Sequence, residues 1–450
     1  MQQPGWLKRN QSALSQAAGW CAFASSAAIV VGIAPSQVLL GASLLALLLS
    51  REKLRLPPIK LPLGLFLLGT LIALALSSDP LAGFPQVKKI YVFSQLLVAF
   101  TLLRGLKVAR WLVITWAACG AASALLGVGQ FAWKFYSISE NGEDYYSGYV
   151  VRRITGFMSH WYTFSVEEML VLLMLGSFLL FSPAAQRRIW WWSCLGIAMG
   201  LGIVLAETRA VWIATVVGAV YLLWCWRPRA ALAIPLIVGI GLLVAPASMR
   251  ERAFSIVHPS TSDSNEFRFI LMRTGWQMIK AHPWFGLGPE MPRIRFMEFL
   301  PKDVPLPLPE GSTIHLHNVY LEYAAERGMP VLIVFLWLIG KILWDFGRGV
   351  RALPPGRDDR RFLLHGGIAV VLSLLVEGMT DYNFGDSEDL TIFLVVVALG
   401  YNALSREAAA ELPEWFRRVP ELPGGSSASS ESQRPLAASR RSQRAGDGTA

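Results

Sequence analysis

The chain has 450 residues, of which 54% are hydrophobic and 16% are charged, and its mean hydropathy is +0.44. Soluble domains are nearer a quarter charged, so this composition excludes an ordinary soluble globular protein. The net charge of +10 would suggest nucleic-acid binding in a soluble protein. In a membrane protein it is explained by anionic headgroups and by basic cytoplasmic loops.

Apolar runs of the length that crosses a bilayer recur along most of the chain. Such a run spans the hydrocarbon core as a helix when it has about 20 residues. We therefore predict an all-α polytopic membrane protein with about 12 transmembrane helices. The predicted spans are residues 13–32, 35–50, 61–77, 89–103, 111–132, 162–181, 189–206, 210–226, 231–247, 319–343, 362–379 and 390–404.

Basic residues between these runs predict the orientation. With a cytoplasmic N-terminus, every even-numbered span ends in a basic cluster, such as Arg104/Lys107/Arg110 or the segment from Arg348 to Arg361. This is the positive-inside pattern. We expect a multi-pass protein of a bacterial inner (cytoplasmic) membrane with both termini in the cytoplasm.

The chain divides into four predicted parts. Residues 1–247 carry the first nine spans, residues 248–318 form a long polar loop, and residues 319–404 carry the last three spans. The tail, residues 405–450, is rich in Ser, Gly, Ala and Arg beyond Pro420. It is predicted to be cytoplasmic and largely disordered.

The long loop, residues 248–318, is predicted to be periplasmic and partly helical. It is too polar to span the membrane, and loops of this length are usually functional or disordered. The stretch from Glu266 to Ile279 fits an amphipathic helix. Its predicted apolar face consists of Phe269, Met272, Trp276 and Ile279.

Several cations on the predicted outer face break the positive-inside pattern. Snorkelling, a helix terminus or an ion pair explains any one of them. As a set they favour an anion site, because cations are selected against on this face unless they are used. Arginine suits a phosphate best, since its fork donates two parallel hydrogen bonds. The cations are Lys88, Lys89, Arg152, Arg153, Arg209, Arg268 and Arg273.

The stretch Gly311–Gly328 carries two histidines where the loop returns to an apolar run. His315 and His317 are two residues apart, so in a helix they would point about 200° from each other and at most one would face a cavity. Either is a satisfied interfacial residue or a general base, since imidazole titrates near neutral pH. We favour His317 as the base and His315 as the interfacial residue.

The sequence gives little support for a metal ion. Two histidines at this spacing with no carboxylate at helical ligand spacing are a weak metal motif. The outer acidic cluster Asp381, Asp386, Glu388 and Asp389 is the one candidate for a hard cation, and a solvated turn is the simpler interpretation. Asp381 is expected to orient the histidine or to pair with an outer arginine.

Four segments together resemble the O-antigen ligase and O-antigen polymerase superfamily. The first is His317-Asn318 followed by Leu321, Glu322 and Glu326-Arg327-Gly328, at the start of a span after a long outer loop. The others are Glu207–Trp212, Arg268 with Trp276 and His282–Pro289, and Arg153–Phe157. The resemblance covers roughly Lys88 to Asn383. Where the family often has a second glycine, this chain has Val331, which argues against close helix packing there.

The resemblance implies an integral-membrane (GT-C-like) glycosyltransferase that works at the periplasmic face. Its donor would be a polysaccharide on undecaprenyl pyrophosphate and its acceptor the lipid A-core oligosaccharide. In the implied single inverting displacement, His317 is the base and Arg209 and Arg268 hold the diphosphate, without a cofactor or a metal ion. Lys88, Lys89, Arg153 and Asp381 assist or bind donor and acceptor groups.

Other functions remain open. An O-antigen polymerase or a protein O-oligosaccharyltransferase would use the same donor and a different acceptor, and the sequence does not identify the acceptor. A transporter of an anionic lipid or solute would instead carry ionisable residues near mid-span. Most ionisable residues here lie at span ends, which favours an enzyme acting on membrane lipids.

Overall fold

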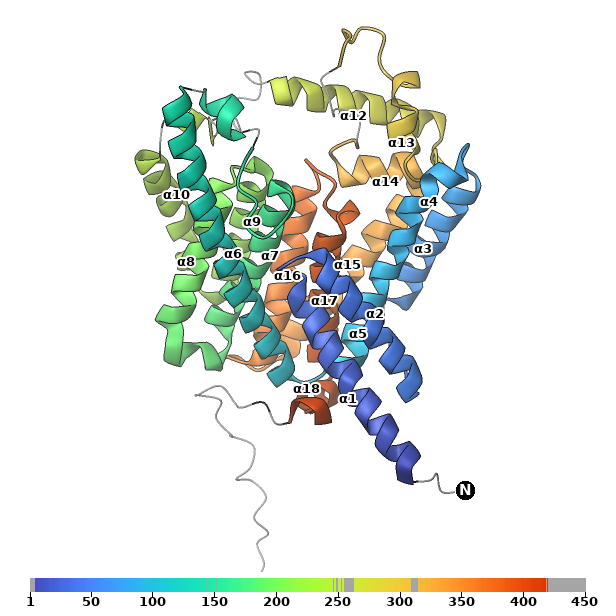
Figure 1. The fold of residues 1–450 in the computed structure, drawn as a ribbon, viewed down its shortest axis with the longest axis vertical. Coiled ribbons are helices and arrows are strands. Elements are labelled where there is room, and N and C mark those ends of the chain that lie inside the picture. Colours follow the sequence, from blue (N-terminus) through green and yellow to red (C-terminus); the bar gives the residue numbers. More distant parts are fainter. Residues whose placement is uncertain are drawn as a thin grey trace, which may run out of the picture.

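A computed structural model describes residues 5–142, 144–150, 152–245, 247, 250–251, 253–254, 263–308, 315–417 and 419. These residues form helices joined by loops, with no strand among them (Figure 1). The first four residues of the Gly311–Gly328 stretch and the predicted disorder beyond Pro420 lie outside the described residues.

The α-helices follow one another along the chain with short connecting helices between them. They are α1 (Gly5–Ala28), α2 (Ile33–Ser50), α3 (Lys60–Ala75), α4 (Pro80–Lys88), α5 (Ser94–Leu102), α6 (Leu106–Asn141), α7 (Trp161–Phe181), α8 (Ile189–Leu205), α9 (Arg209–Trp226), α10 (Ala233–Val244), α12 (Asp263–Ala281), α13 (Met291–Ile294), α14 (Val319–Arg327), α15 (Met329–Ala352), α16 (Asp359–Glu377), α17 (Ser387–Leu404) and α18 (Arg406–Ala410). The short 3₁₀ and π turns are η1 (Lys89–Phe93), η2 (Tyr146–Val150), η3 (Pro183–Arg188), η4 (Pro228–Leu232), η6 (Phe296–Glu298), η7 (Asn383–Gly385) and η8 (Glu414–Phe416).

Each predicted span overlaps a helix, and the all-helical membrane class is confirmed. Among the described residues, 7 helices are long and apolar enough to cross a membrane, and two more apolar helices are shorter. The prediction of about 12 spans stays a prediction. The seven are Ile33–Ser50, Leu106–Asn141, Trp161–Phe181, Pro183–Leu205, Arg209–Trp226, Met329–Ala352 and Ser387–Leu404.

The predicted span over residues 319–343 is wrong, because the helix breaks at Gly328. Helix α14 ends at Arg327 and α15 begins at Met329. Gly328 has φ +84°, and a Cβ placed on it would lie 2.2 Å from the carbonyl oxygen of Trp284. Only glycine allows this backbone and this close approach. Helix α14 is therefore a separate element that precedes the candidate span Met329–Ala352, and the histidines lie at its N-terminal end.

Replacing Gly328 with alanine is expected to lower the melting temperature of the purified protein in detergent. The positive φ and the clash with Trp284 cost on the order of 1–3 kcal/mol. Gly340, in the middle of α15, is the matched control, because a Cβ added there would have no neighbouring atom within 4 Å. Gly340→Ala should be neutral or stabilising because alanine favours the helix. Equal melting temperatures for the two variants would contradict the strain at Gly328.

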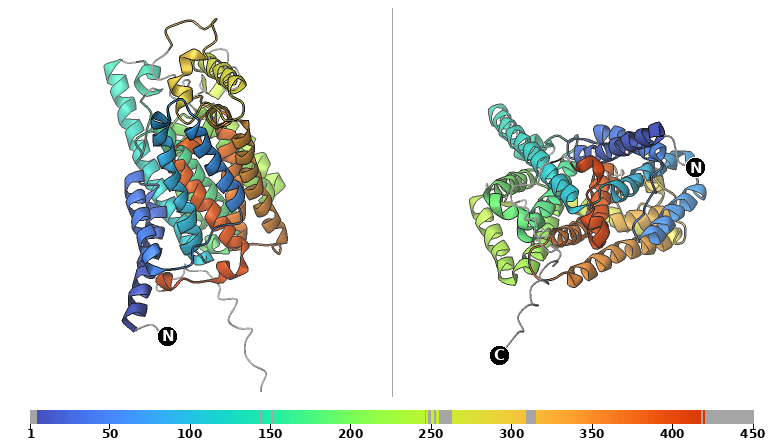
Figure 2. Two further views of the ribbon diagram at one scale, coloured as in Figure 1. Left: turned by 90° about the vertical axis from the view of Figure 1, so that its right-hand side faces the viewer. Right: turned by 90° about the horizontal axis from the view of Figure 1, so that it is seen from below.

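Helices α16 and α17 form the centre of the bundle. Helix α16 packs against α7, α9, α15 and α17, while α17 also packs against α5. Helices α1–α5 lie on one side of this pair and α6–α10 on the other (Figures 1 and 2). Val331 of α15 packs against Gly69 of α3, where a Cβ would lie 2.5 Å from the valine side chain. Close helix packing therefore occurs at Val331 after all, and the glycine that permits it belongs to the neighbouring helix.

The end of the bundle opposite α12 joins the start of the chain to α18 and η8. Trp20 of α1 packs edge to face on Trp415, with ring centroids 5.2 Å apart. Arg104 pairs with Glu411 at 2.6 Å, and Arg360 donates a hydrogen bond of 2.7 Å to the carbonyl of Ala403. The first described residues of the predicted tail, 405–417, are thus ordered against the bundle.

Helix α12 lies across the other end of the bundle, above α14 (Figure 1). The helix predicted from Glu266 to Ile279 is confirmed. Of its predicted apolar face, Ile279 is buried, but Phe269, Met272 and Trp276 are 55%, 47% and 51% exposed. The residues packed below are Leu271, Thr274, Met278 and Ile279, because α14 meets the helix on the adjoining face.

Candidate functional site

The junction between the long loop and α14 is fixed to the end of α16. Asn318 caps α14, since its side-chain oxygen accepts hydrogen bonds of 3.0 Å from the amides of Tyr320 and Leu321. Its side-chain nitrogen donates to the carbonyl of Met379 at 2.8 Å. The amide of Val319 donates to the carbonyl of Gly378, also at 2.8 Å. The capping residue thus both starts the helix and places His317 beside the segment that follows α16.

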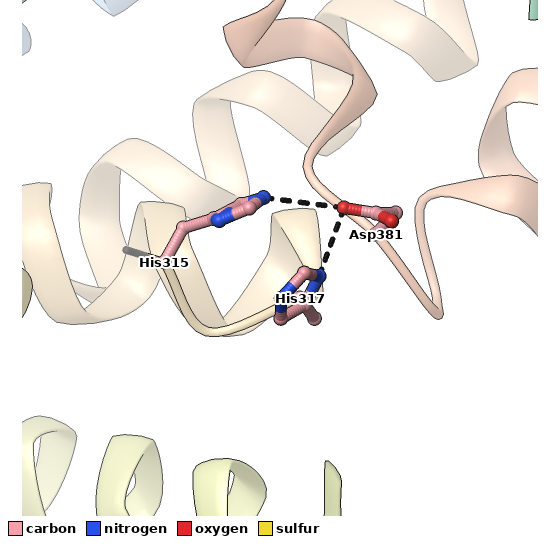
Figure 3. A group of neighbouring side chains, drawn as sticks. All are labelled: His315, His317 and Asp381. Atoms are coloured by element: carbon pink, nitrogen blue, oxygen red, sulfur yellow. Dashed lines mark hydrogen bonds and ion pairs between the residues drawn. The ribbon is translucent and has the colours of Figure 1, made fainter. Parts of the chain in front are cut away.

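His315 and His317 both contact Asp381 (Figure 3). The Nε2 atom of His315 lies 3.2 Å from Oδ1 of Asp381, and the Nδ1 atom of His317 lies 3.1 Å from the same oxygen. His317 has φ +46°, a left-handed conformation in which histidine is over-represented. The pair is therefore not helical, and this turn brings the two rings to one side, with centroids 4.2 Å apart. The expectation that only one of them faces the site, with His315 merely interfacial, does not hold for this geometry.

Asp381 determines which nitrogen of each histidine carries the proton. An ionised carboxylate only accepts, so His317 donates from Nδ1 and its Nε2 keeps a lone pair. The amide of Tyr382 donates to the same Asp381 oxygen at 2.9 Å and fixes the carboxylate. A histidine oriented in this way by a carboxylate is the arrangement of a general base.

The surroundings shift the pKa values of this group. Burial alone would raise the pKa of Asp381, but the hydrogen bond and charge of His317, with those of His315, outweigh it and hold the pKa below its usual range. Burial, together with the neighbouring His317, lowers the pKa of His315 to about 4. Asp381 is therefore ionised and His315 neutral at physiological pH.

The lowered pKa of His315 predicts a loss of stability in mild acid. An unfolded histidine titrates near 6.5, so between pH 6.5 and about 4 the unfolded chain binds the extra proton. Stability should fall as pH falls through this window, by up to about 1.4 kcal/mol per pH unit for one proton. Thermal unfolding of His315→Asn in detergent should show a flatter pH dependence there than the wild type. The slope of His282→Asn, a histidine outside this group, should stay unchanged; a wild-type slope in His315→Asn would contradict the shift.

An open cavity of about 460 Å³ lies beside the histidine pair. Its walls come from α4 and η1, the start of α7, the loop before α13, α14, and the segment between α16 and α17. The described residues that line it are Gln86, Lys89, Ser159, His160, Tyr162, Thr163, Glu290, Arg293, His315, Glu322, Glu326, Tyr382, Gly385, Asp386 and Glu388. Carboxylates and hydroxyls thus outnumber the two cations on these walls, a lining that suits sugar hydroxyls.

The predicted cations occupy different places around this cavity. Lys89 lines it and donates a 3.0 Å hydrogen bond to the carbonyl of Gly385. Arg153 stacks on Trp161, 3.8 Å from the ring centroid. Lys88 lies over the ring of Phe84 at 5.3 Å. Of these three cations, Lys89 lines the cavity, whereas Lys88 and Arg153 are not among its described lining residues.

Arg209 and Arg268, the two predicted diphosphate ligands, lie at the same end of the bundle as the histidine pair. Arg268, on α12, is close enough to Glu377 for its charge to act on that carboxylate. Arg209 is the first residue of α9, and the preceding Thr208 is hydrogen-bonded to Ser165 near the start of α7 at 3.1 Å. His317, Arg209 and Arg268 are not among the described residues lining the cavity, so their convergence on one substrate stays a prediction.

One comparison with known proteins is informative. Residues 194–336 match the family model described as O-antigen ligase, while none of the curated proteins compared matches the chain. The matched stretch contains the turn at Arg209, α12 with Arg268, and α14 with both histidines. Within these residues, the chain is similar to the O-antigen ligase family.

Asp381, which lies 64 residues beyond His317, is outside the matched O-antigen ligase stretch. So are Lys88, Lys89 and Arg153. The centre of the site is therefore shared between the family segment and the α16–α17 connection. Any comparison limited to the family segment omits the carboxylate that orients the histidines.

Sequence reasoning assigned no role to several residues of the candidate site. His160 caps α7, and its Nδ1 accepts a 3.2 Å hydrogen bond from the amide of Tyr162. Tyr162 donates to Glu377 at 2.8 Å. Glu322 accepts a 2.6 Å bond from the amide of Leu316, which secures the turn between the histidines. The pair Glu322 and Glu326, one helical turn apart in the stretch that carries the resemblance, was the available signal for the role of Glu322.

Proposed function

We propose that the chain is an O-antigen ligase that transfers polysaccharide from undecaprenyl pyrophosphate to lipid A-core oligosaccharide. The reaction is a metal-independent, inverting glycosyl transfer at the periplasmic face of the inner membrane, in a GT-C-like scaffold. The observation that carries this proposal is the orientation of His317 by Asp381, with a bond of 3.1 Å, beside an open cavity rich in hydroxyls and carboxylates.

The chemical step uses the free lone pair on Nε2 of His317. As the acceptor hydroxyl attacks the anomeric carbon of the donor, its proton moves to Nε2. The bond from that carbon to the diphosphate oxygen breaks, and the configuration inverts. Asp381 stabilises the imidazolium that forms, while Arg209 and Arg268 neutralise the negative charge that develops on the leaving diphosphate. Lys88, Lys89 and Arg153 assist donor or acceptor binding.

The placement of basic residues supports the proposed topology. Arg104, Arg357 and Arg360 all make contacts at the end of the bundle opposite α12 and α14. By the positive-inside rule that end is cytoplasmic. The histidine pair and the 248–318 loop then face the periplasm, and both termini lie in the cytoplasm. Lipid-linked donors and lipid A-core both reach that face from within the membrane.

Transfer with purified protein in detergent tests the proposal. The reaction contains a defined undecaprenyl-linked glycan and one of three acceptors: lipid A-core, a second lipid-linked glycan, or a protein. We expect a product with lipid A-core alone, and unchanged rates in EDTA. Exclusive extension of the lipid-linked glycan would instead identify a polymerase, and exclusive protein glycosylation a protein O-oligosaccharyltransferase. A requirement for magnesium would instead indicate a magnesium site at Asp386 and Glu388.

Arg209→Lys is expected to reduce the transfer rate by at least about 10-fold, because lysine keeps the charge but loses the bidentate fork. The same assay measures this, with saturating acceptor and a range of donor concentrations. Arg293→Lys, on the exposed rim of the cavity, is the comparison, and its effect should be small. A fully active Arg209→Lys variant would contradict the diphosphate role.

A transporter is the second candidate, favoured by buried carboxylates within the bundle. Glu167 and Glu168 on α7 are each 2% exposed, and each has an oxygen without a hydrogen-bond partner among the described residues. Buried ionisable residues of this kind often mark translocation pathways. Movement of labelled lipid-linked glycan across proteoliposomes without any transfer product would support this alternative.

A further inference from the structure

We propose that His315, His317 and Asp381 bind a divalent transition-metal ion of the Zn²⁺ type, and that this ion inhibits transfer. The binding part rests on geometry alone. The inhibitory part rests on the proposed function, in which His317 is the base and the reaction needs no metal.

The ligand atoms have the spacing of a metal site. One nitrogen from each histidine and one oxygen of Asp381 all lie within 4.8 Å of one another. Around a tetrahedral Zn²⁺ with bonds of about 2.0–2.1 Å, ligand atoms lie roughly 3.3 Å apart. The two nitrogen–oxygen distances, 3.2 and 3.1 Å, already match this edge length. A modest rotation of the two histidine rings would bring their nitrogens to the same spacing from each other and complete the tetrahedral edge.

Supporting contacts hold these ligands in position. The amide of Tyr382 anchors the Asp381 carboxylate at 2.9 Å. His315 packs against the ring of Tyr382, with centroids 5.9 Å apart. The Nδ1 atom of His315 is buried and has no hydrogen-bond partner among the described residues, so no hydrogen bond at that nitrogen competes with a metal ion for the ring. Such outer contacts contribute strongly to metal affinity.

The local charge also suits a dication. Asp381 supplies one carboxylate, and its amide donates a 3.2 Å hydrogen bond to the backbone carbonyl of Glu377. Glu377 is fully buried, and one of its carboxylate oxygens has no partner among the described residues. The Asp381 carboxylate, as one of the three ligands, offsets one of the two charges of such an ion. With two imidazoles in the set, the site selects zinc, cobalt or nickel over magnesium or calcium.

Metal binding removes the catalytic base through a change of tautomer. A metal on Nδ1 of His317 requires that nitrogen to lose its proton, and the neutral ring then carries its proton on Nε2. Protons exchange through solvent, and the ring keeps a single proton throughout. The Nε2 lone pair that accepts the acceptor proton is then gone. Zinc should therefore inhibit without competing with the lipid donor.

Titration of tag-free protein in detergent with Zn²⁺ or Co²⁺ alone tests the binding. We expect one ion per chain and, for Co²⁺, the visible absorption of a four-coordinate site. Affinity should fall by at least about 10- to 100-fold in Asp381→Asn and in His315→Gln, and stay unchanged in His282→Ala. Melting temperatures in metal-free buffer show whether each variant is folded. Absent binding, or equal affinity in the folded variants, would overturn the site.

The inhibitory part has a separate readout. Zinc should suppress transfer by wild-type protein in proportion to site occupancy, and EDTA should restore it. Zinc that binds at one ion per chain yet leaves transfer unchanged would overturn the inhibition. If metal-free protein shows no transfer at all, the proposed function fails, and the Co²⁺ spectrum still decides whether the metal site exists.

Discussion

His317→Ala is expected to reduce transfer by about 10²- to 10⁴-fold, the usual contribution of a general base. In the proposed mechanism, the variant lacks the lone pair that takes the proton from the acceptor hydroxyl. The loss should appear in kcat, with donor and acceptor KM changed little, because the base acts on the proton in the transition state. Undecaprenyl-linked chains should accumulate in cells, since donor synthesis is unaffected.

His282→Ala is the matched control for this experiment. His282 belongs to the same long loop and packs near Phe299, with ring centroids 6.2 Å apart, away from Asp381. Its transfer rate should equal that of the wild type. Full activity in a folded His317→Ala protein would eliminate the base assignment. Partial activity that disappears in the His315→Ala, His317→Ala double variant would instead assign the role to both rings that contact Asp381.

Asp381→Asn is expected to lower transfer on the order of 10³-fold. The amide is isosteric with the carboxylate, so the fold should be retained. It cannot stabilise an imidazolium, and when its NH₂ group faces His317 it enforces the wrong tautomer. The measurement is kcat over pH 5 to 9, because a changed tautomer alters the pH profile while a general loss of fold lowers activity at every pH.

Asp386→Asn provides the comparison for Asp381→Asn. Asp386 lines the same cavity and accepts a 2.8 Å hydrogen bond from Thr163, whereas the hydrogen bonds of His315 and His317 go to Asp381. Asp386→Asn should therefore reduce the transfer rate far less than Asp381→Asn does. Equal losses in both variants would show that the negative charge of the cavity, rather than the pairing of Asp381 with His317, controls the rate.

The elements of the fold were largely predictable because hydrophobic runs and helix terminators are local signals. The helix from Glu266 to Ile279 was found with nearly the right bounds. Its buried face was not, because Phe269 and Trp276 are as apolar as the residues that α14 covers, and periodicity does not say which side meets a neighbour. The break at Gly328 was missed since an apolar run continues through it; the contact with Trp284 that requires glycine is tertiary.

The residue types of the site were predictable, and one of the two roles expected for Asp381 was to orient the histidine; the contact of one carboxylate with both rings was not predicted. The histidines were found from their position at the end of the loop. Their joint contact with Asp381 depends on the positive φ of His317 and on a partner 64 residues away. Neither is encoded in the spacing of two histidines. The same distance explains why a metal motif could not be recognised, since its third ligand comes from another helix connection.

The packing of Trp415 and Phe416 on Trp20 and Phe23 has a consequence for biogenesis. Helix α1 precedes the other described helices in the chain, yet its aromatic partners in η8 follow all of them. Until η8 has been synthesised, the face of α1 that carries Trp20 lacks these aromatic partners. Assembly of the protein therefore finishes with a late closure of the last described segment on the first helix. Substitutions at Trp415 are expected to appear as slow maturation and degradation of newly made chains, with catalysis by the molecules that mature left intact.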